Sequence, residues 1–251
     1  MAQSLLTQVK KAIPSLLTML NLLSGCLAIL ISFQDPALAG LLILLAGVFD
    51  FLDGFAARLL NAWSEFGREL DSLADIISFG AAPSFILFHL INTSLVMEQP
   101  LFSLDGMPPA QLLILGTSFL PVMFAAIRLA RFNIGNGGDA FSGLPSPAAG
   151  IFIASAAYIL FTSDSIWVRE TLFTPVVLAS AGIILSVLMV TPVRMFSIKF
   201  SHFGLSGNKV RYIFLFPSLI LFLWWGVPAI PLIIGWYVLL SVITSLIPIR
   251  E

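Results

Sequence analysis

The chain has 251 residues, of which 59% are hydrophobic and 10% are charged, and its formal net charge is −1. Soluble domains carry about 25% charged residues, so a chain with a mean hydropathy of +1.03 is expected to lie in a lipid bilayer. The near-zero charge gives no reason to expect nucleic acid as a partner. The single cysteine excludes an internal disulfide and a cysteine-rich metal site.

Apolar segments of membrane-spanning length follow one another along the chain. Residues 14–33 come after two lysines and could pass for the core of a signal peptide, but this run is long enough to form a first span. Residues 1–13 are expected to form an interfacial helix. The sequence therefore predicts an all-α fold, a polytopic transmembrane helix bundle in one domain. Its spans, of about 17–25 residues each, are expected at 14–33, 38–60, 68–91, 110–131, 146–163, 172–191, 211–226 and 229–248.

The lysines and arginines define an orientation for these spans. If the N-terminus is cytoplasmic, eleven of the twelve basic residues lie at inner ends or in inner loops, and Arg169 alone lies outside. Cytoplasmic loops carry an excess of Lys and Arg. The pattern predicts a multi-pass protein of the cell (inner) membrane, with both termini in the cytoplasm.

Residues 50–75, DFLDGFAARLLNAWSEFGRELDSLAD, carry four aspartates near the inner ends of two neighbouring spans. A charge at mid-membrane costs about 2.5–3.5 kcal/mol, so four acids in lipid require a reason. In a helix of about 100° per residue, the aspartates of each helix share one face with small residues. This face covers an arc of about 140° on the first of the two helices and about 80° on the second. These arcs hold Asp50, Asp53, Gly54, Ala57 and Arg58 on the second span, and Gly67, Asp71, Asp75 and Ser78 on the next helix. Because a short inner turn joins the two antiparallel spans, the carboxylates are expected to converge.

Converging carboxylates repel one another unless cations neutralise them. Residues 50–75 contain no His or Cys, so an all-oxygen site for Mg²⁺ or Mn²⁺ is expected, with Ca²⁺ as a substitute, rather than one for Zn²⁺. Four acids can hold two ions about 3.5–4 Å apart, the arrangement used for displacement at phosphorus. Arg58 could pair with a phosphate, with a nearby acid, or reach the membrane interface. The alternatives are a cation transporter and a purely structural cluster, but the adjoining small residues and arginine favour an enzyme.

The same positions resemble the signature of the CDP-alcohol phosphotransferases. That signature has two aspartates three apart, then Gly, then Ala-Arg, a spacer, Gly, and two more aspartates at four-residue steps. The resemblance implies a six-helix transmembrane core over residues 14–191, usually in a homodimer, with the site open to the cytoplasm. Residues 192–251 would add a basic loop and a helical hairpin. It assigns metal binding to Asp50, Asp53, Asp71 and Asp75, the general base to Asp75, and the CDP pocket to Gly54, Ala57, Arg58 and Gly67.

Three further segments resemble one branch of that family, the membrane-spanning phosphatidylserine synthases. They are SLADIISFGAAPS (72–84), RLARFN (128–133) and FSGLPSPAAG (141–150). The resemblance implies CDP-diacylglycerol and L-serine as substrates, and phosphatidylserine and CMP as products. Glycerol 3-phosphate, inositol, inositol phosphate and choline stay open as acceptors, and the donor lipid could be diacyl or ether-linked.

A zwitterionic acceptor such as serine requires a cation for its carboxylate. Arg128 and Arg131 lie three residues apart on one helical face at the inner end of the fourth span, so either could bind it. The positive-inside rule accounts for both arginines equally well. Asn133 and Ser78 are further candidates for acceptor binding, although Ser78 could instead bond within its own helix.

Overall fold

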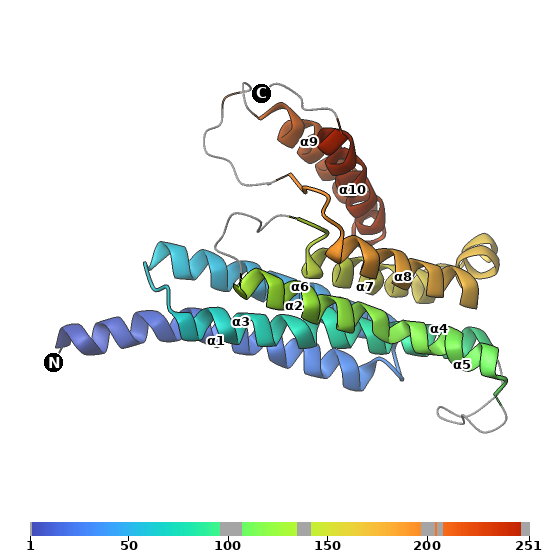
Figure 1. Ribbon diagram of the computed structural model, residues 1–251, viewed down its shortest axis with the longest axis horizontal. Helices are drawn as coiled ribbons and strands as arrows, with labels where there is room; N and C mark the ends of the chain where they lie inside the picture. Colours follow the sequence, from blue (N-terminus) through green and yellow to red (C-terminus); the bar gives the residue numbers. More distant parts are fainter. Residues whose placement is uncertain (1, 96–106, 135–141, 197–203, 205–207, 247–251) are drawn as a thin grey trace.

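The computed structural model describes residues 2–95, 107–134, 142–196, 204 and 208–246, and within these ranges the protein is built from helices. The helices are α1 (Ala2–Ile31), α2 (Pro36–Leu59), α3 (Glu65–Asp75), α4 (Ala82–Leu95), α5 (Pro109–Gly116), α6 (Leu120–Ile134), α7 (Ser146–Thr162), α8 (Pro175–Val190), α9 (Lys209–Trp225) and α10 (Ile230–Leu246). Within the same ranges, four short helical turns of other types occur between some of them: η1 (Ile76–Ala81), η2 (Thr117–Phe119), η3 (Val168–Leu172) and η4 (Val227–Ala229). Figure 1 shows α1 to α8 lying roughly side by side, with the pair α9–α10 inclined to them.

Every segment expected to span the membrane is helical over most of its length, which confirms the predicted polytopic helix bundle. In the part of the chain that the structure describes, five helical runs are long and apolar enough to cross a membrane, and α7 and α8 are shorter apolar helices of 17 and 16 residues. Two of the long runs are composite. The π-helix η1 (Ile76–Ala81) lies between α3 and α4, and the 3₁₀ turn η2 (Thr117–Phe119) lies between α5 and α6. In the basic loop expected from residue 192, residues 197–203 and 205–207 lie outside the described part.

The N-terminal segment differs from the expectation of a separate interfacial helix at residues 1–13. The structure has one continuous helix, α1, with Pro14 in its interior. Pro14 removes one backbone donor, but this does not divide the helix. Residues 2–13 also contain no glycine, the residue that commonly ends a helix. The first turns of α1 project beyond the other helices in Figure 1.

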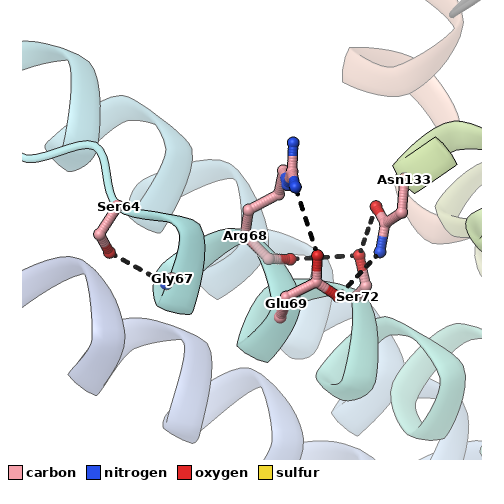
Figure 2. A network of polar contacts seen from close by, with 6 residues as sticks. All are labelled: Ser64, Gly67, Arg68, Glu69, Ser72 and Asn133. Carbon is pink, nitrogen blue, oxygen red and sulfur yellow. Dashed lines mark hydrogen bonds and ion pairs between the residues drawn. The ribbon is translucent and has the colours of Figure 1, made fainter. Parts of the chain in front are cut away.

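Two capped turns direct the chain through the first three helices. Asp35 caps α2 by accepting a hydrogen bond from the Leu38 N–H at 2.9 Å, and Pro36 follows at the first helical position. After α2, Ser64 caps α3 by accepting a bond from the Gly67 N–H at 3.0 Å (Figure 2). This short second turn brings the aspartates of α2 and α3 to the same end of the bundle.

Small residues allow helices to approach closely where the core is formed. A Cβ on Gly150 would lie 2.9 Å from the Phe79 backbone, and a Cβ on Gly40 would clash with the Ala154 carbonyl. Close approach over small residues is typical of membrane helices, whose association relies on packing rather than on a hydrophobic driving force. These contacts fix α7 against α2 and against η1, the turn that directly follows Asp75 in the chain.

A hydrogen bond from Trp236 of α10 to the backbone of α9 links the C-terminal pair of helices and accounts for a tryptophan inside the last span. Pro217 lies inside α9 and has no N–H, so the Ile213 carbonyl four residues earlier lacks its usual helical donor. Trp236 of α10 donates its indole Nε1–H to that carbonyl at 3.3 Å. An unsatisfied carbonyl is costly in lipid, so the proline and the tryptophan form a matched pair across the two helices.

Replacing Trp236 with Phe is expected to destabilise the protein by about 1 kcal/mol, because the Ile213 carbonyl loses its donor. This corresponds to a fall of about 2–4 °C in the melting temperature in detergent. Trp224→Phe is the control, since Trp224 is 79% exposed. In a Pro217→Ala background, where residue 217 regains its N–H, Trp236→Phe should cost much less. An equal cost in both backgrounds would contradict this account.

Candidate active site

Three aspartates from two helices converge on one point. Asp50 and Asp53 come from α2 and Asp71 from α3, and one carboxylate oxygen of each lies within 4.8 Å of the others. Among the described residues, these three form the group that meets this limit, and Asp75 is not a member of the group. All four acids are nevertheless within electrostatic range, since Asp75 interacts with each of the other three. The arrangement concentrates negative charge between α2 and α3.

The acidic group fits a divalent cation on the observations of this structure. Its donors are all carboxylate oxygens, and one oxygen of Asp71 is buried with no hydrogen-bond partner among the described residues. Ligand distances of about 2.0–2.6 Å for Mg²⁺ and Ca²⁺ keep the ligands of one ion within about 5 Å of one another, and the oxygens here lie within 4.8 Å of one another. Asp50, Asp53 and Asp71 could therefore hold a cation.

Helix α1 supplies two polar side chains to the acids, neither of which the sequence analysis had singled out. Thr18 Oγ1 donates to Asp53 Oδ2 at 2.6 Å, and Asn21 Nδ2 donates to Asp75 Oδ1 at 3.4 Å. Asp53 and Asp75 are only 6% and 7% exposed. The available signal was a threonine and an asparagine three residues apart within an apolar span, which places both on one helical face.

Ser78 is fully buried in η1, the π-helix that begins directly after Asp75. Its hydroxyl donates to the backbone oxygen of Asn21 on α1 at 2.9 Å, so it bonds across helices rather than within its own. A Cβ on Gly25 would lie 2.5 Å from Ser78 Oγ. Single π-turns are frequent at functional sites, and this one is clamped to α1 beside the acids.

The four residues assigned to a nucleotide pocket lie around the turn between α2 and α3. Apart from the backbone of its own helix and its chain neighbours, no described atom lies within 4 Å of a Cβ built on Gly54, whereas Ala57 is buried. Gly67 donates its N–H to Ser64, as described above. Arg58 is exposed, and its Nε donates to the Gly54 carbonyl at 3.0 Å. Within the described ranges, no carboxylate lies within ion-pair distance of Arg58, so its remaining donors are available to a phosphate.

The two candidate arginines on α6 occupy different environments. Arg128 is half-buried, its Nη1 donates to Ser146 Oγ at 3.4 Å, and its buried Nε has no partner among the described residues. It also lies within electrostatic range of Asp75. Arg131, one turn later, is exposed. The structure thus brings Arg128, but not Arg131, toward the acidic end of the third span.

Asn133 joins α6 to α3 rather than standing free (Figure 2). Its Nδ2 donates to Glu69 Oε2 at 3.2 Å, and its Oδ1 lies 3.2 Å from the Ser72 hydroxyl. Glu69 also accepts from Arg68 at 3.4 Å. Both ends of the Asn133 amide therefore bond to α3, so contacts between the two helices account for an asparagine at the end of α6.

Comparison with known proteins identifies a family and a set of named relatives. A family model described as CDP-alcohol phosphatidyltransferase matches residues 11–187. The archaetidylserine synthase of Methanothermobacter thermautotrophicus is 37% identical over 163 residues, which cover 61% of this chain and 60% of the relative. The CDP-diacylglycerol–serine O-phosphatidyltransferase of Methanocaldococcus jannaschii is 35% identical over 144 residues, covering 57% and 59%.

A third relative matches over more of its length. The CDP-diacylglycerol–serine O-phosphatidyltransferase of Bacillus subtilis is 33% identical over 197 residues, covering 76% of this chain and 90% of the relative. The chain thus spans about three fifths of the length of the first two relatives and most of the third. Because the family model covers well over half of the chain and includes all four aspartates, the protein belongs to the CDP-alcohol phosphatidyltransferase family.

Proposed function

We propose that this protein transfers the phosphatidyl group of CDP-diacylglycerol to the hydroxyl of L-serine, giving phosphatidylserine and CMP. The carrying observation is the group formed by Asp50, Asp53 and Asp71, whose oxygens lie within 4.8 Å of one another in a chain of this family. The names of the relatives described above support serine as the acceptor and transfer of a lipid-linked phosphate as the reaction.

The four aspartates would hold two divalent cations, Mg²⁺ or Mn²⁺. Such ions, when bound, neutralise phosphate charge and polarise the phosphoryl oxygens. Arg58 would bind a phosphate of the donor through its free guanidinium nitrogens. The open space at Gly54, and the small side chains at Ala57 and Gly67, leave room for the nucleotide beside the backbone. The lipid tails would remain in the bilayer next to the helices.

Asp75 would accept the proton of the serine hydroxyl. At the same step the serine oxygen forms a bond to the phosphorus that carries the lipid, and the bond from that phosphorus to CMP breaks. Asp75 is suited to this role because it lies outside the group of three and its second carboxylate oxygen has no protein donor in the described structure. Arg128 would bind the serine carboxylate through its unpartnered Nε and its second η nitrogen. Ser78 and Asn133, already engaged between helices, would support this pocket indirectly.

The membrane setting follows from the charge distribution. With the N-terminus in the cytoplasm, the acids lie near the cytoplasmic ends of α2 and α3, where CDP-lipid and serine are both accessible. We propose that the protein resides in the cell membrane with both termini in the cytoplasm and that it works as a homodimer. Crosslinking in native membranes would test the homodimer.

The proposal is tested by CMP release from the purified full-length protein in detergent, with Mg²⁺ or Mn²⁺. Each acceptor (L-serine, glycerol 3-phosphate, inositol, inositol phosphate and choline) is supplied in turn, with a diacyl and an ether-linked CDP-lipid. Release that depends on L-serine is expected, with at least about a hundredfold preference. Release with another alcohol would keep the phosphotransfer chemistry and discard serine. No release with any acceptor, together with metal flux into liposomes, would favour a cation transporter.

A further inference from the structure

We infer that Asn21 is a positioning residue that orients Asp75 for proton transfer from the acceptor hydroxyl, an inference that rests on the proposed function. Asn21 lies on α1, outside the aspartate segment, and is fully buried. Its Nδ2 donates to Asp75 Oδ1 at 3.4 Å. One carboxylate oxygen of Asp75 is thereby occupied, and the other is left for the reacting group.

The orientation of the Asn21 amide indicates that the contact with Asp75 dominates its environment. The amide oxygen, Oδ1, is buried and has no hydrogen-bond partner among the described residues. A buried unsatisfied acceptor costs about 1–3 kcal/mol. A flipped amide would place its oxygen against a carboxylate, which can only accept. The Asn21 side chain thus donates a hydrogen bond to Asp75 while its own amide oxygen is left without a donor among the described residues. An asparagine with only a packing role would be expected to have hydrogen-bond partners for both the nitrogen and the oxygen of its amide.

The backbone of α1 holds Asn21 at a fixed distance from Asp75. Ser78, three residues after Asp75, donates to the Asn21 carbonyl at 2.9 Å. Gly25, one turn after Asn21, lets α1 approach so closely that a Cβ there would collide with Ser78. Side chain and backbone of one α1 residue are therefore tied to the same turn of the third span, which limits how Asp75 can rotate.

Thr18 provides an internal comparison, because it performs the equivalent contact on a different acid. It donates to Asp53, which belongs to the group within 4.8 Å, whereas Asn21 donates to Asp75, which does not. Removing the Thr18 hydroxyl should therefore weaken cation binding. Removing the Asn21 amide should slow turnover while leaving the cation held by Asp50, Asp53 and Asp71 nearly unaffected. A purely structural role for α1 predicts no such separation.

The test compares Asn21→Leu, Thr18→Val and Ser24→Ala in the full-length protein in detergent. Ser24 is buried on α1, and among the described residues its hydroxyl bonds the Leu20 carbonyl of its own helix and no other group, so its variant should match the wild type. For Asn21→Leu, kcat should fall about 10–100-fold, as for other groups that orient a functional residue. The KM for serine and for CDP-lipid should stay within about threefold. The Kd for the Mn²⁺ ion at the group of three, measured by electron paramagnetic resonance, should also stay within about threefold. Thr18→Val should instead raise the Kd for Mn²⁺ about tenfold.

Asn21→Ala guards against misfolding of the leucine variant, because it also removes the amide donor and adds neither bulk nor charge beside Asp75. An unchanged kcat in either folded variant would overturn the inference, as would a loss of Mn²⁺ affinity equal to that of Thr18→Val. Failure of both variants to fold would assign Asn21 to packing and also overturn it. Wild-type protein that binds Mn²⁺ but releases no CMP with serine would reject the proposed function instead, and the Mn²⁺ comparison would still be readable.

Discussion

Replacing Asp71 with Asn is expected to lower the rate of serine-dependent CMP release by about 10³-fold or more while the protein remains folded. The change removes one charge from the group that Asp71 forms with Asp50 and Asp53 within 4.8 Å. A cation acting at the transferred phosphoryl group contributes several kcal/mol, and each 1.36 kcal/mol is about tenfold in rate. The rate is measured in detergent at saturating CDP-lipid, serine and Mn²⁺.

A stability measurement separates the electrostatic explanation from misfolding. In EDTA, Asp71→Asn should melt at a higher temperature than the wild type, because the neutral amide relieves repulsion among buried carboxylates. Addition of Mn²⁺ should raise the melting temperature of the wild type more than that of the variant. Glu69→Gln is the matched control, since Glu69 lies on the same helix, is exposed, and is outside the group of three. Turnover above about a tenth of wild type in Asp71→Asn would contradict the role of the acidic group in catalysis.

Replacing Arg128 with Gln is expected to raise the KM for serine about 100-fold, with a smaller effect on kcat and on the KM for CDP-lipid. A hydrogen bond to a charged group contributes about 1.5–3 kcal/mol, and 1.4 kcal/mol is about tenfold in affinity. Arg128 is favoured because its Nε is buried and unpartnered among the described residues, and because it lies within electrostatic range of Asp75. Steady-state kinetics with serine varied at saturating CDP-lipid measures the effect.

Arg131→Gln is the comparison for that measurement. Arg131 carries the same charge one turn further along α6, but its side chain is exposed, so its loss should change the KM for serine by less than about threefold. Arg128→Lys should give an intermediate value, since it keeps the charge but loses the planar guanidinium. Equal effects of Arg128→Gln and Arg131→Gln would reject Arg128 as the specific site for the serine carboxylate.

Only the tertiary structure could distinguish these two arginines. Three residues apart, they share a helical face and the same topogenic explanation, so the sequence left them equivalent. Their difference comes from α7, whose residue Ser146 receives the Arg128 guanidinium, and from the packing that buries one side chain and exposes the next. Burial depends on which distant helix covers a face, and a single sequence does not state that.

The sequence by itself determined the helical bundle and the meeting of the acids on α2 and α3. Apolar segment length depends only on composition, and the acids repeat at helical spacing in 26 contiguous residues with one short turn. Tertiary structure alone decided the partners of those acids. Asn21 and Asp75 are 54 positions apart, and Thr18 and Asp53 are 35 apart. The donor that replaces the missing N–H of Pro217 comes likewise from another helix. Local geometry fixes which residues share a helical face, whereas the neighbour of that face depends on packing among helices far apart in the chain.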